Sequence, residues 1–263
     1  MKKILYNTLL IAAALVSLVA CSADSSLSGN GAVSPNGSNG NPSTGIAGST
    51  AKFAISGDHL YVVDDKNLNV FNLNANELAL DSKFRINTGP GNVIETIFPR
   101  GDALFLGSQM GMIIYNISNP TTPQYLANIV HVLSCDPVVA DDKYAYVTLR
   151  SVQGRCGRTT NQLMVIDIQN LTRPAVVRSY QMVNPKGLGI QNNALFVCDD
   201  GLKLFNATNA NNITLTQHFQ NIPANDLIPM GDKLLMVADD GLYQYTYDAT
   251  NGLQELSKLE IVK

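Results

Sequence analysis

The chain has 263 residues, of which 45% are hydrophobic and 15% are charged, and its formal net charge is −3 at pH 7. This mildly acidic balance excludes the basic surface that nucleic-acid-binding proteins present to phosphate groups. It also excludes electrostatic attraction to anionic lipid as the force that holds the protein at a membrane.

Residues 1–20 are predicted to be a signal peptide. Lys2 and Lys3 precede a short apolar run, and Leu18-Val19-Ala20-Cys21 ends it with small residues before a cysteine. A positive start, a short apolar run and a small-residue end are typical of a secretory signal. A plain signal peptide or a short anchor helix is the alternative, but a membrane-spanning helix needs about 20 apolar residues.

The segment that ends at Cys21 resembles the lipobox of bacterial lipoproteins. The resemblance implies that Cys21 becomes the N-terminus of the mature chain and carries a lipid thioether. Ser22 then follows, as in lipoproteins released from the inner membrane. We therefore expect a lipid-anchored protein of the bacterial cell envelope, at the outer membrane, facing either the periplasm or the exterior.

Residues 21–50 comprise this cysteine and a Ser/Gly/Asn-rich segment with almost no large apolar side chain. Such a composition cannot bury enough surface to offset the conformational entropy of folding. The segment is predicted to be a disordered tether.

Residues 51–263 are predicted to form one domain built from five copies of a hairpin pattern. The clearest copy, residues 195–206, has two apolar runs that flank an Asp-Asp-Gly turn, which is typical of a tight β-hairpin. Successive copies begin 44, 41, 50 and 40 residues apart, a period that matches the four-stranded blade of a β-propeller. The copies span Leu60–Asn72, Leu104–Asn116, Ala145–Asp167, Leu195–Asn206 and Leu235–Thr246.

The two ends of this domain predict how the ring closes. One extended segment, Leu253–Val262, follows the last hairpin and leaves that unit one strand short, whereas Ala51–Ser56 precedes the first hairpin without a partner. We expect this N-terminal strand to complete the last blade and to close an all-β, five-bladed propeller of four-stranded antiparallel blades. A β-sandwich or an open solenoid is the alternative.

Two second strands carry a family resemblance. Residues 162–174, Gln-Leu-Met-Val-Ile-Asp-Ile-Gln-Asn-Leu-Thr-Arg-Pro, and residues 112–123, Met-Ile-Ile-Tyr-Asn-Ile-Ser-Asn-Pro-Thr-Thr-Pro, resemble the LVIVD repeat of bacterial surface propellers. In that family a Leu-x-Val-x-Asp strand precedes an Asn-Pro loop. The copies at Leu202 and Leu242 keep the hairpin but lack the loop. The resemblance implies a cell-surface propeller and brings no catalytic residues with it.

Two of the remaining cysteines are expected to form a disulfide. Cys135 begins the last strand of one repeat unit, and Cys156 lies in an insertion in the hairpin turn of the next. Both positions fall on one face of the ring in neighbouring units, and an exported chain meets an oxidising environment. Two free thiols are the alternative. Cys198 lies in a strand and is expected to be a small buried residue rather than a nucleophile.

Carboxylate pairs recur in the hairpin turns. They could hold a hard cation, because such ions prefer clustered oxygen ligands, but Asp is also favoured in turns for backbone reasons, and the second copy has Ser-Gln instead. Turn formation is the favoured interpretation, and the three histidines have no metal-ligand spacing. The sequence predicts no metal and no cofactor. The pairs are Asp64-Asp65, Asp199-Asp200 and Asp239-Asp240, and the histidines are His59, His131 and His218.

The insertion at residues 150–161 departs from the repeat. It brings Arg150, Arg155 and Arg158 to an otherwise acidic protein. Insertions in repeat proteins often serve binding, so these arginines form a candidate binding loop for an anionic group or a partner. A loop without a partner is the other interpretation.

These features favour a non-catalytic binding or scaffold module for protein or glycan, which contacts the membrane through its lipid and does not bind nucleic acid. The alternative is a hydrolase or lyase that acts on an extracellular polymer at the central channel. That enzyme would need ionisable groups gathered at one channel mouth. The candidate channel-mouth polar groups are Asp58, His59, Asp102, Asp141, Asp142 and Asp232.

Overall fold

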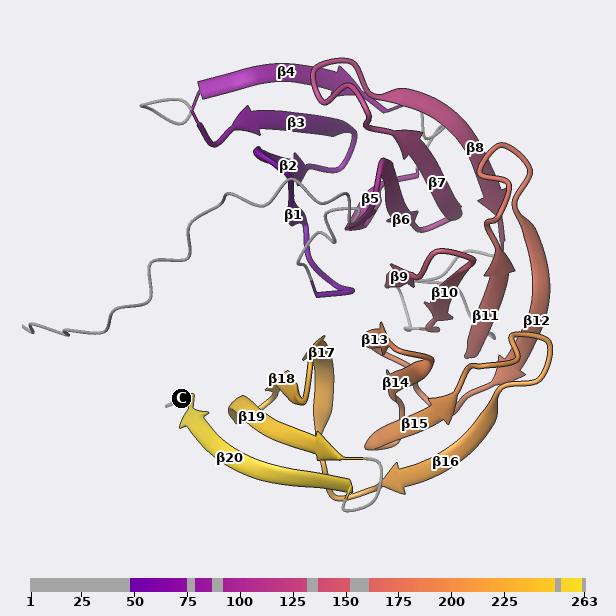
Figure 1. Ribbon diagram of the computed structural model, residues 1–263, viewed down its shortest axis with the longest axis vertical. Coiled ribbons are helices and arrows are strands. Elements are labelled where there is room, and N and C mark those ends of the chain that lie inside the picture. Colours follow the sequence, from indigo (N-terminus) through magenta and orange to yellow (C-terminus); the bar gives the residue numbers. More distant parts are fainter. Residues whose placement is uncertain are drawn as a thin grey trace, which may run out of the picture. The chain divides into compact units, whose positions relative to one another are not determined.

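The computed structural model describes residues 48–74, 79–86, 92–131, 137–151, 161–248 and 252–261. Within these ranges all regular structure is β-strand, and the strands form five sheets of four antiparallel strands each. The sheets are arranged as the blades of a propeller (Figure 1), which confirms the predicted fold class. The predicted signal peptide and Cys21 lie outside the described residues. In the described part of the chain, no helix has the length and apolarity needed to cross a membrane.

Each blade takes four consecutive strands of the chain. Blade I comprises β1 (Phe53–Ser56), β2 (His59–Val63), β3 (Asn67–Asn72) and β4 (Ala79–Arg85), and blade II comprises β5 (Ile94–Arg100), β6 (Ala103–Ser108), β7 (Gly111–Asn116) and β8 (Gln124–Val130). Blade III comprises β9 (Val138–Ala140), β10 (Tyr144–Leu149), β11 (Gln162–Asp167) and β12 (Ala175–Gln181). Blade IV comprises β13 (Leu188–Gln191), β14 (Ala194–Cys198), β15 (Leu202–Asn206) and β16 (Thr214–Phe219). Blade V comprises β17 (Ala224–Met230), β18 (Lys233–Ala238), β19 (Gly241–Asp248) and β20 (Gly252–Glu260).

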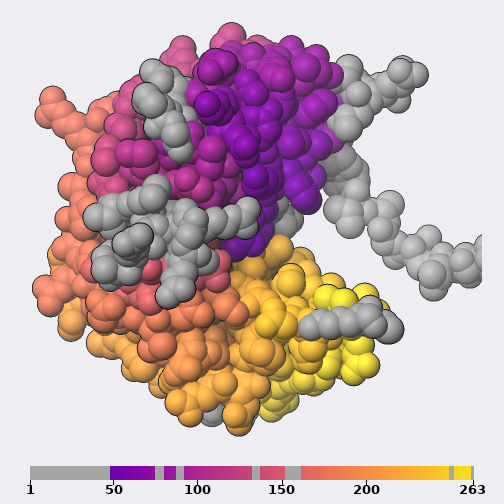
Figure 2. Space-filling view, turned by 180° about the vertical axis from the view of Figure 1, so that it is seen from behind, coloured from indigo at the N-terminus to yellow at the C-terminus, as the bar shows by residue number. Residues whose placement is uncertain are grey.

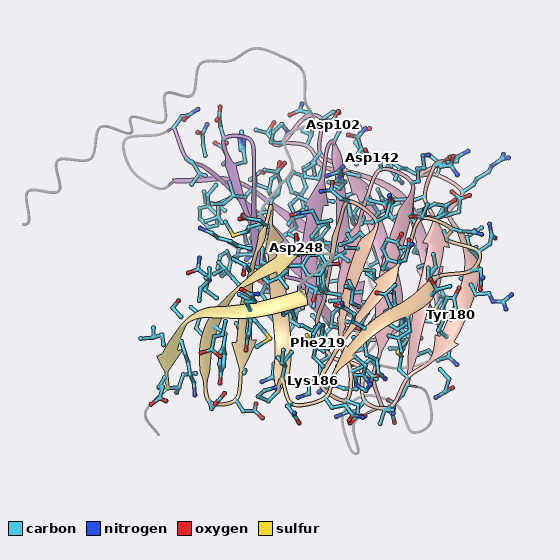
Figure 3. The ribbon with its side chains drawn as sticks, turned by 60° about the horizontal axis from the view of Figure 1, so that its bottom comes forward. Asp102, Asp142, Tyr180, Lys186, Phe219 and Asp248 are labelled. Carbon is cyan, nitrogen blue, oxygen red and sulfur yellow. The ribbon has the colours of Figure 1, made fainter. Side chains whose placement is uncertain are left out.

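The first strand of each blade is the innermost, because β5 contacts β1 and β9, and β13 contacts β9 and β17. The turns from the first to the second strand lie on one face of the ring, and the turns from the second to the third lie on the other. We call these the upper and the lower face, since Figure 3 shows Asp102 and Asp142 at its upper edge and Lys186 at its lower edge. The upper turn of blade IV is tight, and both Asn192 and Asn193 have positive φ, at 49° and 63°, as a type I′ hairpin requires.

Large apolar side chains fill the spaces between neighbouring blades. The third residue of each second strand is an aromatic in blades I to IV, and it is buried between its own blade and the next one. These aromatics are Tyr61, Phe105, Tyr146 and Phe196, and all are at most 1% exposed. Burying such rings is a main source of stability for the fold.

The predicted closure of the ring is wrong. β1 pairs with β2 in the register Phe53↔Val62 to Ser56↔His59 and belongs to blade I, while blade V draws all four of its strands from the C-terminal part of the chain. The sequence argument did not recognise residues 224–230 as the inner strand of blade V. Because only a two-residue turn separates β1 from β2, their pairing costs little loop-closure entropy.

The segment just before β1 enters the centre of the ring (Figure 1), and Thr50 and Lys52 lie there in the same cavity wall as Lys186 of the lower face. There the Asp226 carboxylate of β17 accepts hydrogen bonds from Ser49 Oγ at 2.7 Å, Thr50 N at 3.1 Å and Thr50 Oγ1 at 2.5 Å. Ser49 Oγ also accepts a bond from the Leu188 amide at 2.8 Å, and the Ala51 carbonyl accepts one from Ile97 at 2.9 Å. Residues 49–51 therefore connect blade I with blades II, IV and V.

Replacing Asp226 by Ala should lower the free energy of unfolding by about 2–3 kcal/mol, because hydrogen bonds to a charged acceptor contribute roughly 1.5–3 kcal/mol each and Ser49 is fully buried. The matched control is Asp232→Ala, which removes an exposed carboxylate from an upper turn and should change stability by less than about 0.5 kcal/mol. Urea unfolding of both variants checks this. Equal effects would show that the Asp226 contacts do not stabilise the ring.

Candidate functional site

The described residues form a cavity of about 800 Å³ at the upper mouth of the central channel. Blades II, III, IV and V contribute to its wall through the ends of their inner strands and their upper turns. Its apolar part is lined by Phe98, Val139, Ile190, Ile228 and Met230. Met230 is 46% exposed, so this cavity presents an accessible apolar surface to a ligand. A few polar groups around an apolar floor are typical of ligand sites.

Two fixed polar contacts lie on the rim of this upper cavity. Arg100 donates from Nε and Nη2 to Asp142 Oδ1 at 3.0 and 2.7 Å and so joins blades II and III. Gln191 joins blades IV and V, because its Nε2 donates to the Gly231 carbonyl at 2.6 Å and its Oε1 accepts from the Gly231 amide at 2.9 Å. Both contacts hold the rim in one shape.

Asp141, the second carboxylate of the upper cavity, accepts hydrogen bonds within the turn in which it lies. Its Oδ1 accepts from the amides of Lys143 and Tyr144 at 2.7 and 2.8 Å, and its Oδ2 accepts from the Tyr146 hydroxyl at 3.1 Å. Burial raises the pKa of Tyr146, and the nearby Asp141 charge adds to this effect. The phenol therefore stays protonated and remains a donor to Asp141.

The other predicted channel-mouth groups lie in or beside upper turns but do not line this cavity. The backbone carbonyls of Asp58, Asp102 and Asp232 accept hydrogen bonds from Leu73, Ile117 and Tyr247, each at 2.8 Å, which extends the hairpin beyond the turn. His59 Nε2 lies 3.3 Å from Asp81 Oδ2 of the outer strand of its own blade. Of the six candidate groups, the structure brings only Asp141 and Asp142 to the cavity wall.

A second cavity, of about 820 Å³, lies at the lower mouth and includes Arg150 of the predicted binding loop. Lys186 Nζ donates to Asn225 Oδ1 at 2.5 Å, and Asn225 Nδ2 donates to Asp239 Oδ1 at 2.6 Å. Asp226 and Thr50 lie in the same wall. Arg155 and Arg158 lie outside the described residues, so the loop itself stays a prediction.

The recurrent carboxylate pairs form turns, as expected. Asp64 Oδ1 accepts from the amides of Lys66 and Asn67 at 2.9 and 2.8 Å, and the bond from Lys66 lowers the pKa of Asp64. Hydrogen bonds from Lys258 and Tyr243 lower the pKa of Asp240. Among the described residues, no group of three or more His, Cys, Asp or Glu side chains is arranged to bind a metal ion.

Asp199 has the most buried of these turn carboxylates. Its side chain is fully inaccessible and lies 2.7 Å from Lys203 Nζ, whose own side chain is 13% exposed. Asp199 also accepts from the amides of Val183 and Asn184, at 3.0 and 2.6 Å for the Oδ1 contacts. This carboxylate therefore fixes the connection between blades III and IV to the hairpin of blade IV.

Cys198 is the free thiol among the described residues, and it is buried. Burial raises the pKa of this thiol, and the nearby Asp226 charge acts in the same direction. A raised pKa keeps the sulfur protonated, which is unsuitable for a nucleophile. Cys135 and Cys156 lie outside the described residues, so their pairing stays a prediction.

Most of the residues that shape the two mouths were not among the predicted site residues. Arg100 and Met230 occupy equivalent positions, at the ends of Ile97-Phe98-Pro99-Arg100 and Leu227-Ile228-Pro229-Met230, and each is followed by Gly-Asp. This short internal repeat was a usable signal. Asp226, Gln191 and Lys186 carry no comparable signal, because their partners are distant in sequence.

A comparison with known protein families finds repeat segments in this chain. The LVIVD repeat family matches residues 47–70 and 134–182. These two segments of the chain are thus similar to the LVIVD repeat. No curated protein shows significant sequence similarity to it.

Several solved structures share the fold of this LVIVD-repeat chain. A functionally unknown protein from Desulfotomaculum acetoxidans has a TM-score of 0.62 at 11% identity, with 80% of this chain and 69% of that chain covered. A protein from Lactobacillus plantarum has a TM-score of 0.60 at 16% identity, with 76% and 67% covered. The periplasmic gluconolactonase of Pseudomonas aeruginosa has a TM-score of 0.59 at 16% identity, with 78% and 68% covered. Identities this low establish similarity of fold alone.

Replacing Asp199 by Asn should lower the free energy of unfolding by about 3–5 kcal/mol, because loss of one partner leaves the Lys203 charge buried and unpaired. The neighbouring change Asp200→Asn affects an exposed carboxylate and should alter the free energy of unfolding by less than about 0.5 kcal/mol. Chemical denaturation of the two variants tests this difference. If the two substitutions cost the same, the Asp199 contacts do not fix this turn.

The Cys198 thiol should resist alkylation by iodoacetamide at pH 8 in the folded protein and react readily after unfolding in urea. The cause is the raised thiol pKa together with burial. Mass spectrometry of the peptide that contains Cys198 measures the extent of labelling. Rapid labelling of the folded protein would contradict the buried, protonated state.

Proposed function

We propose that this LVIVD-repeat protein is a lipid-anchored propeller of the bacterial cell envelope that binds a protein or glycan at the upper mouth of its ring without catalysing a reaction. The first part of the proposal rests on residues 1–21, whose positive start, short apolar run and cysteine fit a lipoprotein signal. A structurally similar propeller is named as periplasmic, which agrees with an envelope location.

The observation that carries the binding role is the upper cavity of about 800 Å³. It joins an accessible apolar floor to a polar rim that Arg100–Asp142 and Gln191–Gly231 hold in place. Because the site is preformed, its side chains lose little conformational entropy when a ligand binds. Its mixed surface suits a peptide or a sugar, both of which offer apolar faces beside hydrogen-bonding groups.

A hydrolase or lyase at the same mouth has less support. General acid–base catalysis needs a carboxyl group within reach of the substrate and able to exchange a proton. Asp142 is paired with Arg100, and Asp141 is bound to two amides and a phenol. The similar fold of the gluconolactonase does not transfer its activity at 16% identity.

The binding role is tested by a pull-down from solubilised bacterial envelope with three immobilised forms of the chain. We expect the native protein and the control Val176→Arg, an exposed outer-strand position, to retain the same protein or glycan. Met230→Arg should retain at least tenfold less, because it places a long charged side chain among the apolar side chains that line the cavity. If Met230→Arg retains as much as the native chain, the upper cavity is not the binding site.

A fourth form, in which Asp-Gly replaces residues 150–161, tests the candidate binding loop on the lower face. If only this form fails to retain the ligand, the ligand binds at the arginine loop and not at the upper cavity. Hydrolytic activity on envelope polysaccharide that persists in Val176→Arg and disappears in Asp141→Asn/Asp142→Asn would instead support the enzyme.

The lipid anchor and the disulfide are tested on protein purified from membranes. We expect an N-terminal peptide that starts at Cys21 and carries acyl chains. We also expect a peptide pair joined through Cys135 and Cys156 that separates on reduction. A Cys21→Ser variant that remains in the membrane fraction would contradict lipid anchoring.

A further inference from the structure

Blades I and V each have one sheet face that is not packed against another described blade. The inner strands of blades I and II, II and III, III and IV, and IV and V are in extensive contact, whereas strands of blades I and V are not in comparable contact. Figure 1 shows the ring open between these two blades. In Figure 2 the indigo atoms of blade I and the yellow atoms of blade V separate toward the rim. We call this opening the seam.

The strand registers define the seam face of blade I. Phe53 lies opposite Val62, Ile55 lies opposite Leu60, and Leu60 lies opposite Phe71. Side chains directly opposite each other in an antiparallel sheet share a face, so these five apolar residues form one surface. Phe53 is 60% exposed and Ile55 is 45% exposed.

The strand registers also define the seam face of blade V. Ile228 lies opposite Leu235, Val237 lies opposite Leu242, and Leu242 lies opposite Leu259. Val237, Leu242 and Leu259 are 46%, 41% and 70% exposed. Apolar side chains thus border the seam on both sides. An exposed apolar surface of this extent marks an interaction site.

The same positions are buried wherever a neighbouring blade exists. The third residue of the second strand is Phe105 in blade II and Phe196 in blade IV, which are at most 1% exposed, and its counterpart in blade V is the half-buried Leu235. The second residue is the buried Leu104 in blade II, and its counterpart in blade I is the half-buried Leu60. The two seam faces therefore continue the blade-to-blade interface of the ring.

This continuity with the blade-to-blade interface indicates what kind of structure fits into the seam. A blade of a propeller is an antiparallel sheet with apolar side chains on both faces, as in β6, where every residue is buried. Residues 22–47 of this chain have almost no large apolar side chain and do not match. A second copy offers only its own blade I or blade V, each already packed on one face, and so cannot fill both sides of the seam.

We propose that the seam is a docking site for an antiparallel β-hairpin of another protein, with large apolar side chains on both faces. One face of this hairpin packs on Phe53, Ile55 and Leu60, and the other packs on Leu235, Val237 and Leu242. The hairpin takes the position of a further blade. The six residues that the hairpin packs on do not line the upper cavity, so either site can fail without the other.

The test uses the chain's own hairpin as a probe. A fluorescein-labelled peptide of residues 194–206 with the change C198S presents the strands β14 and β15, and a peptide of scrambled sequence is its control. Residues 41–263 form one unit, so the chain from Ser22 to Lys263 is used without its signal peptide. Fluorescence anisotropy measures binding of each peptide.

Two matched variants locate the binding. The seam variant carries F53T, I55T, V237T and L242T. The control variant carries Y125T, V130T, V176T and L215T, which change equally exposed apolar side chains on the outer strands of blades II, III and IV. Threonine keeps a high strand propensity, and thermal unfolding confirms that both variants fold.

We expect saturable binding of the hairpin peptide to the native chain and the control variant, at least tenfold weaker binding to the seam variant, and no saturable binding of the scrambled peptide. Absence of saturable binding to the native chain, or equal binding to both variants, would overturn the proposal. Sedimentation equilibrium is run on the same samples. A native dimer that dissociates in the seam variant would assign the seam to a second copy and also overturn the proposal.

Discussion

The hydrogen bonds to the Asp226 carboxylate join parts of the chain that lie 177 residues apart in sequence. They tie Ser49 and Thr50, just before the first strand, to the inner strand of the last blade. Propellers usually avoid open edges by closing the ring, and here no strand is shared between the first and last described blades. The segment in the channel therefore links the first blade to the last one through these hydrogen bonds. The position of the Asp226 carboxylate requires a glycine at residue 187, because a Cβ there would lie 2.2 Å from Asp226 Oδ1.

The recurrent acidic residues of the repeat serve the backbone. Asp64, Asp141 and Asp199 each accept hydrogen bonds from amides that a turn would otherwise leave unpaired. A carboxylate used in this way contributes to the stability of the fold. The cavity at the upper mouth is lined instead by positions that vary between blades, such as Arg100, Gln191 and Met230.

The same blade design explains both the core and the seam. Each second strand sends alternate side chains to the blade before it and the blade after it, so a blade in the middle of the ring is apolar on both faces. The first and last blades keep that pattern, but on one side no other blade of the described residues packs against them. Their apolar side chains at these faces, such as Phe53 and Val237, therefore remain exposed.

Periodicity in the sequence was enough to predict the number of blades and their four-stranded sheets, because hairpins form through contacts between neighbouring segments. The turn role of Asp64 was also readable, since it depends on the amides of residues two and three positions further along the chain.

Tertiary structure alone decided how the ring closes and where the cavities lie. The strand β1, Phe-Ala-Ile-Ser, alternates exposed and buried residues, and its sequence is compatible with pairing to either end blade. Only the register with β2 shows which blade it joins. The hairpins at Leu195 and Leu235 look aligned by their Asp-Asp-Gly turns, yet Leu195 corresponds in the fold to Leu234, because the turn of blade V is shorter. A one-residue shift moves every side chain of a strand to its other face. The partners of Asp226, Gln191 and Arg100 are brought together by packing between blades, which no local pattern encodes.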